Sequence, residues 1–193
     1  GSMNSLTTLN LETNSLSGPI PSSTGAMSSL KVLSVGTNFL NGTIPASIGS
    51  MLALEGLFAF NNTLSGTLPS QLGALLDLTK LEVDENQLSG PLPTVLGGLT
   101  KLQFLAVGIN LLTGSLPVSL GSLSNLVSFT ADTNSLSGTV PAALGCLTKL
   151  LELILKGNSL TGTLPPALGS LTKAILVNVG GNMLAGTLPS SWG

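Results

Sequence analysis

The stretch Asn134-Ser135-Leu136-Ser137-Gly138-Thr139-Val140-Pro141 recurs along this chain as Asn-x-Leu-x-Gly-x-Z-Pro, where Z is Leu, Ile or Val. Each copy begins 24 residues after the one before it, at Asn14, Asn38, Asn62, Asn86, Asn110, Asn134, Asn158 and Asn182. A fixed period of roughly 20 to 29 residues predicts a solenoid, in which each repeat packs only against its neighbours. The period is therefore more informative about the fold than any single residue.

The period divides the whole chain without an insertion or a deletion. With Gly1 counted as position 1, repeats begin at Gly1, Gly25, Gly49, Gly73, Gly97, Gly121, Gly145 and Gly169, and Gly193 opens a ninth. We predict a single solenoid domain over residues 1–193. Solenoids normally carry atypical repeats at their ends. Both ends here follow the common pattern and lack intact caps, so we expect the chain to be a segment of a longer array.

Seven positions of the repeat predict the core. Positions 3, 6, 9, 11, 16, 20 and 24 are apolar in 55 of 56 cases, so every repeat sends the same side chains inward. Positions 9 and 11 alternate with outward positions, as in Leu105-Ala106-Val107, which is typical of a half-buried strand. Eight such strands, one from each repeat, predict one parallel sheet.

Three further positions predict the path of each coil. Asn at position 14 can satisfy backbone groups where the chain leaves the strand, and the eight Asn side chains would form a ladder along the solenoid. Gly at position 18 permits a positive φ or a close backbone approach, and Pro at position 21 precedes a short helical or 3-10 turn. We interpret these residues as structural.

Composition excludes several classes of partner and site. Six Lys, no Arg and eight Asp or Glu give a net charge of -2, whereas a nucleic-acid partner requires a basic surface. The lack of His and the single Cys146 exclude Cys/His metal clusters and an internal disulfide. No run of about 20 apolar residues could span a bilayer, so an attachment to a membrane would need segments absent here.

The repeat resembles the plant-type leucine-rich repeat, Leu-x-x-Leu-x-x-Leu-x-Leu-x-x-Asn-x-Leu-x-Gly-x-Ile/Leu-Pro, over the whole chain. The resemblance implies an α/β solenoid, wound as a right-handed superhelix, with the parallel sheet on its concave face. It also implies short second strands around positions 15–19. The implied role is non-enzymatic recognition at the cell surface or outside the cell, as in receptor-like kinases, receptor-like proteins and polygalacturonase inhibitors.

The candidate binding residues lie at the solvent-facing positions 7, 8, 10, 12 and 13. In repeats 3–5 these positions hold aromatic and charged residues, and the candidate ligand-binding residues are Phe58, Phe60, Lys80, Glu82, Asp84 and Phe104. With strands about 4.8 Å apart, Phe58 lies beside Glu82 and Phe60 beside Asp84. Exposed aromatic residues are typical of a hot spot for a protein or peptide ligand. The alternative is a solvated face with scattered apolar side chains and no ligand, and the residues leave both open.

The residue types offer little support for catalysis, so we predict no enzymatic activity, no metal site and no cofactor. Without His, Tyr or Arg, acid–base chemistry would fall to carboxylates such as Glu82 and Asp84. An open sheet offers no obvious pocket that would shift their pKa. A calcium ion takes roughly six to eight oxygen ligands, which no loop of the repeat supplies.

A function of another class would use the Ser and Thr residues at positions 17 and 19. They form an array of hydroxyl and methyl groups that would suit an ice or glycan lattice, at Ser65, Thr67, Ser137, Thr139, Thr161 and Thr163, with Thr43 and Thr187 continuing it. The array is interrupted by Pro19, Pro91, Asn41 and Ala185. We rank this alternative below recognition of a protein or peptide.

Two sequons for N-glycosylation begin at Asn41 and Asn61 and are compatible with an extracellular or cell-surface protein. A glycan on Asn61 would lie beside Phe58 and Phe60. The sequence therefore predicts a module that binds a protein or peptide ligand, with a cell-wall or surface glycan as a further option. The ligand and the oligomeric state stay open.

Overall fold

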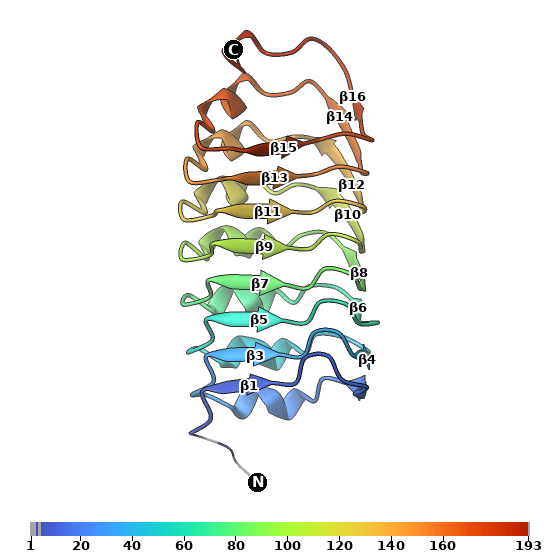
Figure 1. Cartoon of the computed structure of the whole chain (residues 1–193), viewed down its shortest axis with the longest axis vertical. Helices are drawn as coiled ribbons and strands as arrows, with labels where there is room; N and C mark the ends of the chain where they lie inside the picture. The colour runs from blue at the N-terminus through green and yellow to red at the C-terminus, as the bar shows by residue number, and fades with distance from the viewer. Residues whose placement is uncertain (1–2, 4, 193) are drawn as a thin grey trace.

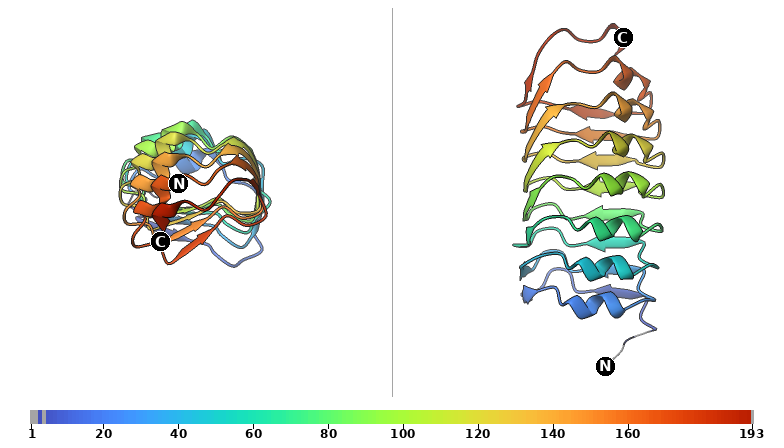
Figure 2. Two further views of the ribbon diagram at one scale, coloured as in Figure 1. Left: turned by 90° about the horizontal axis from the view of Figure 1, so that it is seen from above. Right: turned by 180° about the vertical axis from the view of Figure 1, so that it is seen from behind.

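The computed structural model describes residue 3 and residues 5–192, and it shows eight stacked coils (Figure 1). Each coil contributes a strand to the main sheet, a short strand on the adjoining side and a 3-10 turn on the opposite face (Figure 2). The stack is nearly straight, and successive coils are rotated relative to one another, as Figure 2 shows from above. Within the described part of the chain, no helix is long and apolar enough to cross a membrane.

The main sheet has eight parallel strands in sequence order, one from each coil. Each residue pairs with the residue 24 positions further on, so Leu57 lies beside Leu81 and Phe58 beside Glu82. The strands are β1 (Thr8–Asn10), β3 (Val32–Ser34), β5 (Gly56–Phe58), β7 (Lys80–Glu82), β9 (Phe104–Ala106), β11 (Ser128–Thr130), β13 (Glu152–Ile154) and β15 (Leu176–Asn178).

These strands cover only positions 8–10, so the chain leaves the sheet earlier than the apolar alternation indicates. The turn that follows each strand has a left-handed backbone at position 13, with φ between 49° and 56° at six residues other than glycine. Most side chains disfavour this conformation. Positions 12 and 13 therefore belong to the turn that follows each strand.

The second strands occupy the predicted region around positions 15–19. They form a six-stranded sheet from β16 to β6 and a separate β2–β4 pair. Their bounds are β2 (Ser17–Pro19), β4 (Phe39–Asn41), β6 (Ser65–Gly66), β8 (Gln87–Gly90), β10 (Leu111–Ser115), β12 (Ser135–Thr139), β14 (Ser159–Gly162) and β16 (Met183–Leu184).

Among the described residues, all helical segments are 3-10 turns. The helical part of the predicted α/β solenoid is therefore 3-10 helix and not α-helix. Each of the first seven begins directly after a proline at position 21, for example after Pro93. The turns are η1 (Ser22–Ala26), η2 (Ala46–Ser50), η3 (Ser70–Ala74), η4 (Thr94–Gly98), η5 (Val118–Ser122), η6 (Ala142–Cys146), η7 (Pro166–Ser170) and η8 (Ser190–Trp192).

The apolar positions form one continuous core between the main sheet, the second strands and the 3-10 turns. In the middle coils these side chains are fully buried, as at Leu78, Leu81 and Leu88. In the first and last described coils the same positions are more exposed, because each of these coils packs against only one other described coil. Leu188, at position 20 of the last coil, is 78% exposed, whereas Leu92 at the same position of the fourth coil is 2% exposed.

The Asn residues at position 14 bind backbone groups of two successive coils. Asn110 is buried, and its Oδ1 accepts a hydrogen bond of 2.8 Å from the N–H of Leu88. Its Nδ2 donates to the carbonyl oxygens of Val83, Val107 and Gly108 at 3.0–3.3 Å. The same set of bonds recurs at Asn38, Asn62, Asn86, Asn134, Asn158 and Asn182. Asn14 lies in the first described coil, and its described bonds go to Leu11 and Glu12 of that coil.

Two glycine columns allow the coils to turn and to stack. At position 18 all eight glycines have φ between 70° and 88°, a conformation that glycine adopts without steric cost. At position 1 the constraint is space, because a Cβ on Gly97 would lie 2.3 Å from the carbonyl oxygen of Ser119. This second requirement was not recognised from the sequence, although every repeat has Gly at that position.

Candidate functional site

The outward surface of the main sheet, at positions 7, 8, 10 and 12, is called here the sheet face, and it carries the predicted binding residues. Lys80 lies at its centre, next to Gly56 on one side and Phe104 on the other. The Nζ atom of Lys80 is 6.0 Å from the ring centroid of Phe58 and 5.0 Å from that of Phe104. Attraction between an ammonium group and aromatic faces favours this arrangement. Three of the predicted residues thus form a cluster with one cation between two rings.

Glycines in the outward columns set where the aromatic rings lie. An added Cβ on Gly56 would come within 2.7 Å of the Phe58 ring, and one on Gly36 would come within 2.8 Å of the Phe60 ring. The backbone of Phe60 lies beside Asp84 as expected, since the N–H of Asn61 donates to the Asp84 carbonyl at 3.0 Å. The Phe60 ring, however, points toward the second coil. The sequence feature that indicates this orientation is Gly36, which occupies the same outward-facing repeat position one repeat before Phe60.

The carboxylates of Glu82 and Asp84 form a half-buried edge beside the cluster. Burial raises the pKa of Glu82, and the Asp84 carboxylate raises it further, while Lys80 opposes the shift. Burial also raises the pKa of Asp84, with contributions from Glu85 and Asp132, and a backbone hydrogen bond opposes it. The ionised form of each carboxyl group is therefore less stable in the folded chain than in the unfolded chain.

The raised pKa values predict that removing the two charges stabilises the fold, by an amount that depends on pH. A raised folded-state pKa means that the folded state binds protons more tightly than the unfolded state, so stability falls as pH rises from the unfolded pKa through the folded pKa. We expect the double variant Glu82→Gln, Asp84→Asn to melt at a higher temperature than the wild type at pH 7. The difference should vanish below the normal carboxyl pKa. Melting curves at several pH values test this prediction. The control is Glu55→Gln, at an exposed carboxylate that is paired with Lys31. An equal gain in melting temperature at acid pH would contradict the prediction.

A shallow pocket continues the sheet face toward the C-terminal coils. Its volume is about 270 Å³, and it is lined by Phe104, Val127, Ser128, Leu151, Glu152 and Ile175. The apolar members of three successive coils occupy position 7, and Ser128 Oγ donates to Glu152 Oε2 at 3.1 Å. Apart from Phe104, these residues were not among the predicted binding residues. Their signal in the sequence was the run of Val, Leu and Ile at one outward position.

The Ser and Thr array at positions 17 and 19 is irregular in the structure. Several hydroxyls are engaged by the preceding coil, since Ser65 donates to the Gly42 carbonyl at 3.3 Å and Thr161 donates to that of Gly138 at 3.4 Å. Large apolar side chains also project at position 15 of the same strands, at Phe39, Leu111 and Met183. Their exposed fractions are 58–62%, so the surface is stepped.

The two sequon asparagines are both exposed. Asn41 ends β4 on the side of the solenoid, away from the main sheet. Asn61 follows the strand of the third coil with φ 49°, and its Nδ2 lies 3.5 Å from Thr37 Oγ1. Among the described residues, no group of three Asp, Glu or Cys side chains is arranged to hold a metal ion.

Comparison with known proteins identifies the repeat. A family model described as Leucine Rich Repeat matches residues 5–27 and 149–171. The plant peptide hormone receptor RGFR1 in complex with RGF2 is 36% identical, with a TM-score of 0.97 over 98% of this chain and 30% of that chain. This chain is built of leucine-rich repeats of the plant type. No curated protein matches it at a significant level.

Two further solved structures resemble this leucine-rich-repeat chain. The ectodomain of the membrane receptor kinase GASSHO1/SCHENGEN3 from Arabidopsis thaliana, in complex with CASPARIAN STRIP INTEGRITY FACTOR 2, is 39% identical. Its TM-score is 0.94 over 95% of this chain and 22% of that chain. A plant ice-binding protein is 24% identical, with a TM-score of 0.79 over 97% of this chain and 68% of that chain, and shares the fold. The chain spans less than a third of the two receptor chains.

Proposed function

We propose that this chain is a non-enzymatic recognition module that binds a protein or peptide ligand through the sheet face. The observation that carries the proposal is the cluster in which Lys80 Nζ lies between the rings of Phe58 and Phe104. All three side chains are only half-buried, so each still presents surface to a partner. Because neighbouring residues already hold the rings in place, binding would cost little further side-chain entropy.

The size of the surface fits an extended peptide. Phe104 belongs both to the cluster and to the pocket, so the cluster and the pocket adjoin and together extend from Phe58 in the third coil, past Lys80, to Ile175 in the eighth. Five strand spacings of about 4.8 Å give a length of about 24 Å. An extended peptide covers that length with about seven residues at about 3.3 Å each.

The charge distribution favours a ligand with a positive group at one side of the apolar surface. Seven of the eight carboxylates lie at positions 7–13, at Glu12, Glu55, Glu82, Asp84, Glu85, Asp132 and Glu152, against three lysines, Lys31, Lys80 and Lys156. Lys31 is already paired with Glu55 at 2.8 Å. A cationic group beside Asp84 would relieve the repulsion that helps to raise its pKa.

The similarity to receptor ectodomains supports this proposal. RGFR1 is described as a plant peptide hormone receptor, and both it and GASSHO1/SCHENGEN3 were solved with a bound factor. By extension, we place this chain outside the cell or at its surface, with a protein or peptide as partner. Asn41 and Asn61 would then be available for glycosylation.

The proposal is tested with a random peptide library displayed on phage and selected against the immobilised chain. Titration calorimetry then compares the selected peptide on the wild type and on Lys80→Ala, Phe104→Ala and the double variant Phe58→Ala, Phe60→Ala. We expect each change to weaken binding at least about tenfold, because central anchors dominate such interfaces. The control is Val118→Ala in η5, an apolar residue that is 70% exposed on the opposite face. Unchanged affinity in all sheet-face variants would refute the proposed site.

A further inference from the structure

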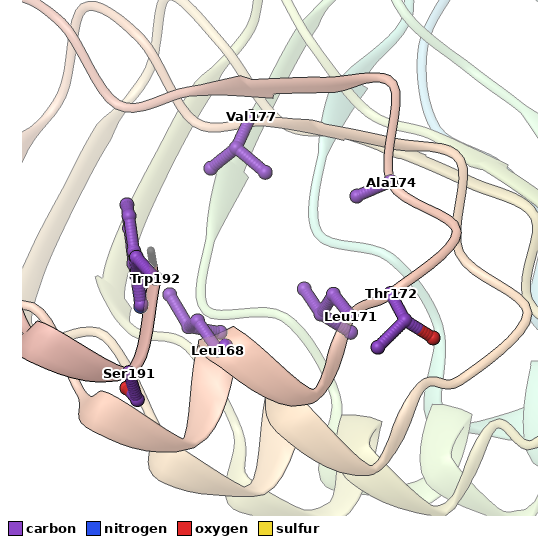
Figure 3. Close-up of a pocket in the computed structure, with 8 residues that line it drawn as sticks. Leu168, Leu171, Thr172, Ala174, Val177, Ser191 and Trp192 are labelled. Atoms are coloured by element: carbon purple, nitrogen blue, oxygen red, sulfur yellow. The ribbon is translucent and has the colours of Figure 1, made fainter.

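The pocket on the sheet face joins apolar walls to one carboxylate, that of Glu152. Its lining residues lie at positions 7 and 8, so the pocket opens outward from the main sheet. The hollow in Figure 3 is of another kind, because Leu168, Leu171 and Val177 occupy core positions and lie between the sheet and the 3-10 turns. The pocket, and not the hollow, can therefore receive part of a ligand bound on the sheet face.

The polar groups of the pocket present hydrogen-bond acceptors to a ligand. Ser128 in β11 pairs with Glu152 in β13, and Ser128 Oγ donates to Glu152 Oε2 at 3.1 Å. A serine hydroxyl has one proton to donate, and here the carboxylate takes it. The lone pairs of Ser128 Oγ and the remaining lone pairs of the half-buried Glu152 carboxylate stay free. A ligand group that enters the pocket therefore needs to be a donor.

The negative charge of Glu152 is not neutralised within the described part of the chain. Glu152 takes part in neither of the two ion pairs formed there. Lys149 of the same coil donates to Asn125 Oδ1 at 2.6 Å. Lys80, at the same repeat position as Glu152, is three strands away, which is about 14 Å at about 4.8 Å per strand. That separation exceeds the Debye length of about 8 Å at physiological salt, so Lys80 does not repel a cation bound at Glu152.

We propose that this pocket binds an arginine or lysine side chain of the peptide ligand, an inference that rests on the proposed function. The alkyl stem packs against Phe104, Val127 and Leu151. The charged head donates to the Glu152 carboxylate and to Ser128 Oγ. Arginine and lysine heads carry donors and no acceptor, which matches the acceptors that the pocket presents. Both side chains can bury an apolar stem while the head stays at a polar edge.

The pocket discriminates against other classes of side chain. An aliphatic group would pack against the walls but would cover the Glu152 carboxylate without bonding to it, and burying an unpaired charge is unfavourable. An acidic group would be repelled by the same carboxylate. A short polar group would leave the apolar walls in water. The pocket therefore selects a long basic residue, in addition to the cationic group expected beside Asp84.

The test uses the peptide that phage selection enriches on the immobilised wild-type chain. Each basic residue of that peptide is replaced in turn by norleucine, which keeps an alkyl stem without the charge, and by diaminobutyrate, which keeps a charge on a shorter stem. Titration calorimetry measures every peptide on the wild type and on Glu152→Gln. At one basic residue, norleucine should weaken binding about tenfold on the wild type and no more than about twofold on Glu152→Gln. Diaminobutyrate at that residue should weaken binding to both chains, because the shorter stem leaves the apolar walls.

The control is Glu55→Gln, which removes one carboxylate that is paired with Lys31 in another part of the sheet face. It should show the same norleucine effect as the wild type, and circular dichroism checks that both variants are folded. Equal norleucine effects on the wild type and on Glu152→Gln, or an enriched peptide without a basic residue, would overturn this inference and leave the proposed function standing. Undiminished binding of the diaminobutyrate peptides would overturn it as well. If no peptide is enriched, the proposed function fails and this inference fails with it.

Discussion

Replacing Asn110 with alanine is expected to lower the free energy of unfolding by about 3 kcal/mol. The Asn110 side chain makes four hydrogen bonds, one accepted from the Leu88 N–H and three donated to carbonyl oxygens. Alanine can make none of them, and the site is buried, so water does not readily replace the lost partners. A buried polar group without a partner costs about 1–3 kcal/mol, and here several groups lose theirs at once.

The matched control is Asn14→Ala, the same residue type at the same repeat position. Asn14 is exposed at the end of the solenoid and makes two hydrogen bonds within its own coil. Its replacement should cost about 1 kcal/mol or less, because water can bind the released groups. Urea unfolding followed by far-ultraviolet circular dichroism measures both variants. Equal losses for the two would show that the cost does not come from the bonds between coils.

Replacing Gly97 with alanine is expected to destabilise the chain by about 3 kcal/mol or more. The added Cβ would lie 2.3 Å from the Ser119 carbonyl oxygen and 2.7 Å from its carbonyl carbon. These are backbone atoms of the next 3-10 turn, so no side-chain rotation can relieve the contact. The turns η4 and η5 would have to separate, and the loss would fall on the interface between two coils near the middle of the solenoid.

The adjacent Gly98 provides the control for Gly97. An added Cβ at Gly98 meets nothing within 4 Å, and its backbone is not in the left-handed region. Gly98→Ala should therefore leave stability unchanged or raise it by about 0.5 kcal/mol through the lower entropy of the unfolded chain. In Gly97→Ala, fluorescence of the single Trp192 and circular dichroism should report different unfolding transitions, since a weakened middle interface lets the two halves unfold separately. A loss in Gly98→Ala equal to that in Gly97→Ala would contradict the steric explanation.

The solenoid was predictable because every column of the repeat has the same environment in each coil. Once the 24-residue phase is known, the parallel register follows, and Phe58 pairs with Glu82 as the phase requires. The buried positions were predictable in the same way, because the seven apolar positions of every repeat pack into a single core. The second strands around positions 15–19 were also predicted, in that case by resemblance to the repeat family.

The binding surface was only partly predictable, because outward side chains are placed by their particular neighbours. Register shows that Lys80 is beside Phe104, but not that its Nζ lies between two rings. The Phe60 ring turns to the second coil because Gly36 leaves room for it there. The pocket beyond Phe104 could not be predicted in the same way. It depends on the distances between Val127, Leu151 and their neighbours, which repeat positions alone do not provide.

The sequence by itself determined the number of coils, their register, their core and the residue types that face solvent, because periodic burial allows one solution. Only the tertiary structure decided the three-residue length of the main strands, the close approach of the Ser119 backbone to Gly97 and the positions of the exposed rings. Those features depend on how closely neighbouring coils pack. That distance is set by all atoms of two adjacent coils together, and no single column of the repeat contains it.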